Sequence, residues 1–319
     1  MQRTFLRASV SFALAAIVAG WLGSVASAEL EPLPRFVGTE VEQDELVQAI
    51  SSAHSRSFKP VGHSSVVFRM RTVERVTAAL KVRSREIQRG YQHEIAAYRI
   101  GRLLGLDNIP PAVYRRSTWK EIQQRFHDDM LARRGSVRRA VLWDDDGSVP
   151  GAAIYWVKGL RSVGLENKAR WQSWVRDGEV PQSKERLARD LSTMAVFDFL
   201  IGNWDRFSGG NLPTDPRRER ALLRDNDRSF STPLLERRYQ KLLDGLTATE
   251  RFSRDMVRHL MALDEAAIRT ELARDPGHAV EPLLSDVQIA DVLGRRSTIL
   301  SYVAALIEEH GEDHVLFFP

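Results

Sequence analysis

The pattern of apolar and polar positions begins, after a leading segment, with alternation of the kind seen in β-strands. Residues 59–72 and 75–84 are rich in Val, Thr and Phe and predict two strands with a short connection. In the second run, Lys81 falls on the same face as Thr77 and Ala79, opposite an apolar face. A lysine on the face with the small residues is expected to point towards a partner or a ligand.

Helical periodicity appears once in the first half of the chain and dominates the second half. Residues 85–106 place apolar side chains on one stripe, and Glu94 lies beside that stripe. Strand-like runs return between residues 107 and 160, and from about residue 183 onward the chain is mostly helical. The sequence therefore predicts strands with one helix first and a helical part second, joined near residues 156–161.

The first residues carry a different pattern. Arg3 and Arg7 precede an apolar run, and small residues follow it at positions 26–28. This order is typical of a secretory signal peptide, with cleavage near Ala28. The alternative is an uncleaved N-terminal anchor, and in both cases the remaining domain is expected outside the cytoplasm, in the periplasm or the extracellular space. No other apolar run is long enough to span a bilayer.

Composition excludes several classes of function. The formal charge of +4 falls to +2 once Arg3 and Arg7 are removed, which argues against a protein that binds nucleic acid through bulk charge. The chain has no cysteine, so disulfides and thiol chemistry are excluded. Only seven of the 46 basic residues are lysines, and a lysine in an apolar setting is therefore informative.

Four residues follow one another in an order that suits the chemistry of a nucleoside triphosphate. Lys81 is a candidate cation for the phosphates, and Glu94 can hold that lysine in place. Asp205 can accept the proton of an attacking hydroxyl, and Asp225 can hold a divalent ion. Asn211 is a further candidate metal ligand. We therefore expect ATP together with Mg²⁺ or Mn²⁺.

Smaller signals extend this nucleotide hypothesis. Ala79, two residues before the lysine, is small enough to lie against an adenine. Gly62, Ser64 and Ser65 belong to a turn that could cover the phosphates, although the turn contains a single glycine.

Two segments in the second half resemble the atypical secretory-pathway kinases, the group that contains the four-jointed and Golgi casein kinases. They read FDFLIGNWDR at 197–206 and LRDNDRSF at 223–230. A third segment, HEIAAYRIGRLLGLDNIPP at 93–111, resembles the helix that contains E-I-A-A in that group. The resemblance extends over roughly residues 58–310, and a looser similarity links the aspartate motifs to the phosphoinositide kinases.

The resemblance implies an α+β, two-lobed protein-kinase-like fold. After a signal peptide at 1–28 and a lead segment at 29–57, a small β-rich N-lobe would occupy residues 58–157. A mostly helical C-lobe would follow at 158–319.

The resemblance also implies roles for individual residues. Asp205 becomes the catalytic aspartate, Asp225 the metal aspartate and Glu94 the partner of the lysine. Two features depart from the family, because many of its members have disulfides and place the lysine in an F-K-P motif. That motif occurs here at Lys59, which makes Lys59 a rival of Lys81. We favour Lys81, because it ends a strand of β-branched and small residues.

Residues near these positions are expected to support the site. Asp198 should accept hydrogen bonds from the backbone of the catalytic loop, and Asn203 and Arg206 should brace that loop, unless Arg206 steadies a phosphate. Asp227 is either a second metal ligand or a solvent-facing residue. His93 has no metal partner at ligand spacing and is interpreted as structural.

The function predicted from these observations is that of an exported kinase. It would transfer the γ-phosphoryl group of ATP to a Ser or Thr of a secreted protein or to a glycan hydroxyl. The alternatives are a pseudokinase that binds nucleotide without transfer, and a metal-dependent glycosyltransferase that uses residues 225–227 as a D-x-D site. The second alternative requires a domain of alternating strands and helices, which the helical second half does not provide.

Overall fold

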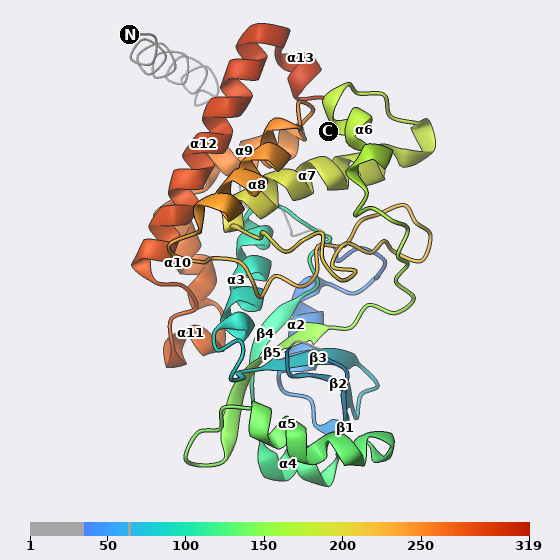
Figure 1. Cartoon of the computed structure of the whole chain (residues 1–319), viewed down its shortest axis with the longest axis vertical. Coiled ribbons are helices and arrows are strands. Elements are labelled where there is room, and N and C mark those ends of the chain that lie inside the picture. The colour runs from blue at the N-terminus through green and yellow to red at the C-terminus, as the bar shows by residue number, and fades with distance from the viewer. Residues whose placement is uncertain (1–34, 63–64) are drawn as a thin grey trace.

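The computed structural model of the chain describes residues 35–62 and 65–319. The predicted signal peptide and Ser64 lie outside the described residues. Figure 1 shows a sheet and short helices in the lower part of the molecule and a cluster of longer helices in the upper part. This arrangement agrees with the two lobes predicted from the sequence.

The lower lobe contains a five-stranded sheet in which every neighbouring pair is antiparallel. The spatial order is β1-β2-β3-β5-β4. The strands are β1 (Ser55–Pro60), β2 (Val67–Thr72), β3 (Thr77–Val82), β4 (Ala112–Thr118) and β5 (Ser148–Tyr155). The lysine-bearing strand β3 therefore lies in the middle of the sheet, where Lys81 pairs with Val67 on one side and Ala152 on the other.

Helix α3 (Gly90–Leu103) joins the two lobes. Figure 1 shows it between the sheet and the helices of the upper lobe, and its side chains belong to the main core cluster of the molecule. Ile95, Ala96 and Ala97 are fully buried because the helix packs against the sheet on one side and against the helical lobe on the other. A helix buried on both sides provides a fixed support for any polar residue that it carries.

A second core cluster lies within the lower lobe and includes Phe58, Phe68 and Ile122. The segment after β4 contributes to it and contains α4 (Trp119–Gln124), the 3-10 helix η1 (Asp128–Arg133) and α5 (Arg134–Ala140). In the lead segment, α2 (Gln43–Ser51) also lies near β4 and β5.

The upper lobe is built around α7 (Glu185–Ile201), most of whose side chains are buried. The other elements of the lobe are η2 (Lys168–Arg170), α6 (Gln172–Arg176), η3 (Gln182–Lys184), α8 (Glu236–Thr247), α9 (Arg254–Ala262), α10 (Glu265–Ala273), α11 (Pro276–Val280), α12 (Asp286–His310) and α13 (Glu312–Val315). Helix α12 begins with a capping box at Ser285. Across residues 35–62 and 65–319, no helix combines the length and apolar character needed to cross a membrane.

Candidate active site

Three carboxylates surround the lysine of the central strand. The Nζ atom of Lys81 lies 2.6 Å from Oε1 of Glu94, 2.6 Å from Oδ1 of Asp225 and 2.9 Å from Oδ2 of Asp227. The Lys81 side chain is 8% exposed, whereas that of Asp225 is 36% exposed. The arrangement thus brings together β3, α3 and the segment after residue 222, and Asp225 is its most accessible member.

The electrostatics of this cluster are governed by burial and by a shortage of positive charge. Burial disfavours the ammonium group, but the three carboxylates outweigh it and raise the pKa of Lys81 well above its usual value. Burial also raises the pKa of Glu94, against the effect of the lysine. Burial acts against ionisation of Asp225 too, yet the neighbouring ammonium lowers the pKa of this residue overall. One lysine cannot neutralise three carboxylates, so the cluster favours a further cation.

The segment that carries Asp225 and Asp227 takes its shape from a left-handed residue. Asp225 has φ 63°, a conformation that Asp and Asn tolerate better than most residues. The backbone N–H of Asn226 donates to Oε2 of Glu94 at 3.1 Å, so the segment is bound directly to α3. Both aspartates thereby contact Lys81.

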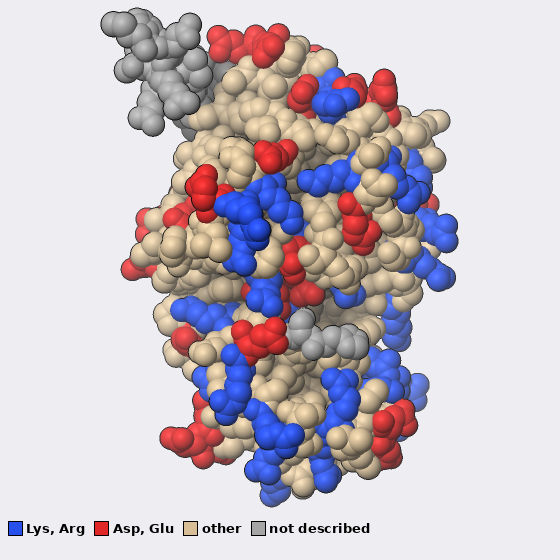
Figure 2. All heavy atoms as spheres, viewed as in Figure 1, with Lys and Arg blue, Asp and Glu red and all other residues tan. Residues whose placement is uncertain are grey.

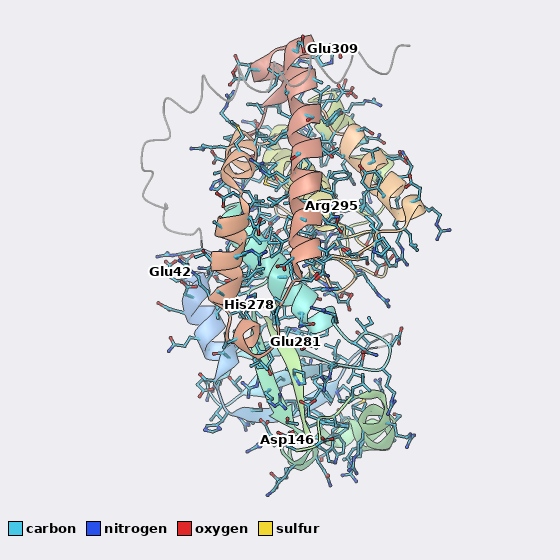
Figure 3. The ribbon with its side chains drawn as sticks, turned by 90° about the vertical axis from the view of Figure 1, so that its left-hand side faces the viewer. Glu42, Asp146, His278, Glu281, Arg295 and Glu309 are labelled. Carbon is cyan, nitrogen blue, oxygen red and sulfur yellow. The ribbon has the colours of Figure 1, made fainter. Side chains whose placement is uncertain are left out.

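Helix α3 is itself held at its N-terminal end by the upper lobe. The hydroxyl of Tyr91 donates to Oε2 of Glu281 at 3.1 Å, and Gln92 donates to the carbonyl of Pro282 at 3.2 Å. Figure 3 shows Glu281 where the chain leaves α11 and passes close to α3. These contacts fix the position from which Glu94 reaches the lysine.

The catalytic loop predicted from the sequence begins where α7 ends. Gly202 has φ 70° and terminates the helix in the left-handed conformation that glycine adopts most easily. Arg295 of α12, labelled in Figure 3, donates to the carbonyl of Leu200 at 2.7 Å and supports this helix end. The chain therefore enters the loop from a fixed point.

Two asparagines hold the backbone of Asp205. The side-chain oxygen of Asn203 accepts from the N–H of Asp205 at 3.2 Å, and Nδ2 of Asn211 donates to its carbonyl at 3.1 Å. The Asp205 side chain is partly exposed and its carboxylate has no hydrogen-bond partner within the described part of the chain. The carboxylate is therefore free to accept a hydrogen bond from a bound molecule.

Arg206 links the predicted catalytic loop to the segment that carries Asp225 and Asp227. Its Nη2 lies 2.8 Å from Oδ1 of Asp198 and 2.7 Å from Oδ1 of Asn226, and its Nη1 donates to the carbonyl of Arg224. Arg206 is 1% exposed, so it braces the loop and cannot steady a phosphate in this arrangement. The carboxylate of Asp198 binds this guanidinium, whereas the sequence predicted a hydrogen bond to loop backbone.

The sequence analysis missed Asn226, which lies in this bracing network. Asn226 accepts from Asn203 and Arg206, and also donates to the carbonyl of Leu223 at 3.2 Å. The only signal was its presence in the D-N motif beside Asp225. The network couples the residue predicted to be catalytic to the residue predicted to hold a metal.

The carboxylates form a set that suits a hard divalent cation. Oxygen atoms of Glu94, Asp225 and Asp227 all lie within 4.8 Å of one another, and carboxylate oxygens are the ligands that Mg²⁺ and Mn²⁺ prefer. Asp227 is 8% exposed, so the solvent-facing alternative is wrong. Within residues 35–62 and 65–319, Asn211 forms no hydrogen bond with the three carboxylates. Its Nδ2 binds the carbonyl of Asp205, which leaves its Oδ1 free of that bond.

The rival lysine has a different environment. Nζ of Lys59 lies 3.1 Å from Oδ2 of Asp129, whose side chain is 65% exposed. Lys59 is on the edge strand β1, two strands away from β3. Of the two lysines, Lys81 is the one that contacts Glu94.

The turn between β1 and β2 is described at Gly62 and Ser65. A Cβ at Gly62 would overlap the carbonyl oxygen of Ser65, so no larger residue fits the turn without a shift. Ala79 lies on β3 opposite Ile154 of β5 and is half-buried. Ala79 thus lies on the same strand as Lys81, whereas Gly62 lies between the two preceding strands.

His93 has a supporting position, in keeping with its interpretation as structural. Its Nδ1 lies 3.1 Å from the carbonyl oxygen of Asp227, and its ring packs against Phe230. Burial lowers the pKa of His93 to about 4, so the ring is neutral near pH 7 and Nδ1–H donates to that carbonyl. His93 thereby helps to fix the segment that carries two of the carboxylates.

Comparison with known proteins gives one relative in sequence. No protein-family model matches the chain. The chain is 30% identical over 134 residues to a human glycosaminoglycan xylosylkinase. The matched region covers 40% of this chain and 31% of the relative, so the chain matches about a third of the length of that protein.

Solved structures show the same fold over most of the chain. The Golgi casein kinase with Mn/ADP bound superposes with a TM-score of 0.63 at 16% identity, covering 86% of this chain and 78% of that one. The hydra Fam20 with sugar gives a TM-score of 0.64 at 17% identity, covering 88% and 93%. The predicted α+β, two-lobed kinase-like fold is therefore confirmed. The chain is related in sequence to an atypical secretory-pathway kinase, and it shares the fold of that family.

Proposed function

We propose that this protein is a kinase that transfers the γ-phosphoryl group of ATP to a hydroxyl group. The observation that carries the proposal is the contact of Lys81 with Glu94 and Asp225 on a kinase-like fold. Lys81 would bind the phosphates, and Glu94 would hold its ammonium group in place. Asp205, whose carboxylate is free of other partners, would orient the acceptor hydroxyl and accept its proton.

The divalent ion would be held chiefly by Asp225, the most exposed of the three carboxylates, with Asp227 beside it. The ion supplies neutralisation of the charge on the transferred phosphoryl group. Manganese is supported by the Golgi casein kinase, which was solved with Mn/ADP bound, and magnesium has the same preference for oxygen ligands. Asn211 remains a proposed additional ligand, through Oδ1.

For the acceptor, we favour a glycan hydroxyl over a protein Ser or Thr. The relative detected by sequence is named a glycosaminoglycan xylosylkinase, whereas the Golgi casein kinase is similar in fold at 16% identity. A protein acceptor remains the second candidate. The glycosyltransferase alternative loses its support, because the fold is kinase-like.

A test of nucleotide binding distinguishes a kinase from a protein that has no nucleotide site. ATP with Mn²⁺ should raise the melting temperature of the purified protein, because a ligand that binds the folded state stabilises it. ATP with a chelator should have little effect. Equal stabilisation with and without the ion would contradict the proposed metal site.

The Lys81–Glu94 pair is expected to act as one unit. Lys81→Met and Glu94→Gln should each lower kcat/KM by about 10- to 100-fold, the range for a hydrogen bond between charged groups. The double variant should lose little more, because the second change removes a contact that is already broken. Steady-state kinetics of the three variants would check this.

Lys59→Met is the matched control for the lysine assignment. It removes an ammonium group whose partner is the exposed Asp129, and it should leave kcat/KM near the wild-type value. An inactive Lys59→Met together with an active Lys81→Met would transfer the phosphate role to the F-K-P motif.

We also propose that the protein is exported and that its mature form begins at Glu29. The charged start, the apolar run and the small residues before Glu29 support this. Mass spectrometry of the N-terminus of the protein recovered from outside the cytoplasm should find Glu29. Recovery of the full-length chain from the cytosol would contradict export.

A further inference from the structure

Arg69 of β2 lies on the face of the sheet that carries Lys81. It is the cross-strand partner of Ala79, which comes two positions before Lys81 on β3. Partners in an antiparallel sheet point to the same face, and so do residues two apart on one strand. Phe68 and Met70, which alternate with Arg69, belong to the core cluster on the other face. Arg69 is therefore a diagonal neighbour of Lys81, with Cβ atoms roughly 7–8 Å apart, a separation that long side chains can span.

This face of the sheet is directed towards the helical lobe. Ala152, the partner of Lys81 on β5, belongs to the main core cluster, which also contains side chains of α3 and α7. Lys81 itself contacts Glu94 of α3 and Asp225. Figure 2 shows Asp and Glu side chains where the two lobes meet, and Lys and Arg side chains spread over the lower lobe. Arg69 and the carboxylate cluster thus lie on the same side of the sheet.

The guanidinium of Arg69 has no partner in the part of the chain that the structure describes. Arg69 is half-buried, and its Nε atom is buried without a hydrogen-bond partner there. It also forms no ion pair within those ranges. Its neighbour on β1, Lys59, does have a counter-charge, because the Nζ atom lies 3.1 Å from Oδ2 of Asp129. A half-buried charge without a counter-charge is costly, so an anion bound beside Arg69 would stabilise the folded protein.

The carboxylate cluster has no positive charge to spare for a triphosphate. One lysine and three carboxylates carry a formal charge of −2, which a single divalent ion would cancel. The phosphates of ATP bring further negative charge, which this neutral set leaves unbalanced. A guanidinium offers a planar fork of N–H donors that matches the geometry of phosphate oxygens. The charge and the shape of Arg69 therefore both suit the phosphates.

We propose that Arg69 is a second phosphate-binding residue of the nucleotide site, and that its guanidinium donates to phosphate oxygens beside Lys81. The inference rests on the proposed nucleotide binding and deepens it, because it assigns a residue of β2 to the same ligand. The two cations differ in what they can offer. Lys81 is shared with three carboxylates, whereas the charge of Arg69 is fully available to the phosphates.

The test measures the binding of ATP with Mn²⁺ and of adenosine by calorimetry. Arg69→Met should weaken the binding of ATP by about 10- to 100-fold, the range for hydrogen bonds to charged groups, and leave the affinity for adenosine unchanged. Unchanged ATP affinity would overturn the proposed contact. An equal loss for ATP and adenosine would assign Arg69 to the nucleoside and overturn the phosphate contact as well.

Arg71→Met is the matched control. Arg71 is on the same strand and the same face, but it is exposed and lies opposite Thr77, further from Lys81. This variant should keep both affinities near the wild-type values. An equal loss of ATP affinity in Arg71→Met and Arg69→Met would indicate a general effect of charge and overturn a specific contact.

The melting temperature of the unliganded protein separates binding from folding. Arg69→Met should keep or raise it, because the change removes a half-buried charge that has no partner. A markedly lower melting temperature would reveal a structural role and overturn the proposal. ATP binding that depends on Arg69, without transfer to any acceptor, would support the phosphate contact while the proposed transfer fails. Transfer by wild type together with unchanged ATP affinity in Arg69→Met would remove the phosphate contact alone.

Discussion

Asp205→Asn is expected to lower phosphoryl transfer by about 10²-fold or more, the upper part of the range for a positioned acid or base. The amide is nearly isosteric with the carboxylate but cannot accept the proton of the acceptor hydroxyl. Because Asn203 and Asn211 hold the backbone of this residue, the loop should keep its shape. Nucleotide affinity should therefore stay within a few-fold of wild type, and the loss should appear in kcat.

The measurement is single-turnover transfer from γ-labelled ATP, together with ATP affinity by calorimetry. Asp255→Asn is the matched control, because it makes the same change at an exposed position on α9. If Asp205→Asn transfers phosphate at the wild-type rate, the role of base belongs to another residue.

Asp225→Asn is expected to remove metal-dependent nucleotide binding. The affinity for ATP with Mn²⁺ should fall by about a hundredfold or more, beyond the 10- to 100-fold cost of losing a partner in the outer shell of a metal site. Asparagine is the substitution of choice, because the positive φ of Asp225 is unfavourable for alanine. Lys81 keeps Glu94 and Asp227 as partners in this variant, so the fold should survive.

Calorimetric titration of ATP with Mn²⁺ and with a chelator checks this expectation. Asp227→Asn provides the comparison within the cluster, and it should weaken binding less, because Asp227 is the less exposed of the two aspartates. Unchanged metal-dependent affinity in Asp225→Asn would show that the ion is held elsewhere.

Local sequence patterns predicted the elements that carry the site. Alternation around Lys81 identified β3, and the apolar stripe beside Glu94 identified α3. Gly202, where α7 ends, is a local signal of the same kind, because a glycine can adopt the left-handed conformation that ends a helix. In each case the signal lay within one turn or one strand of the residue concerned.

Contacts between distant segments could not be derived from such patterns. Lys81 and Asp225 are 144 positions apart, and periodicity carries no information on whether they meet. The pairing of Asp198 with Arg206 was also missed. A buried carboxylate can accept from backbone donors or from side-chain donors, and the sequence pattern does not distinguish them.

The proposed activity is the transfer of phosphate from ATP with the help of a divalent ion. The most direct measurement incubates purified residues 29–319 with γ-³²P-ATP, Mn²⁺ or Mg²⁺, and both glycan and protein acceptors. Label is expected in an acceptor, with glycans preferred, and it should be lost when the ion is chelated or when Asp205 is replaced by Asn. ATP binding without transfer to any acceptor would contradict phosphotransfer and identify the protein as a pseudokinase.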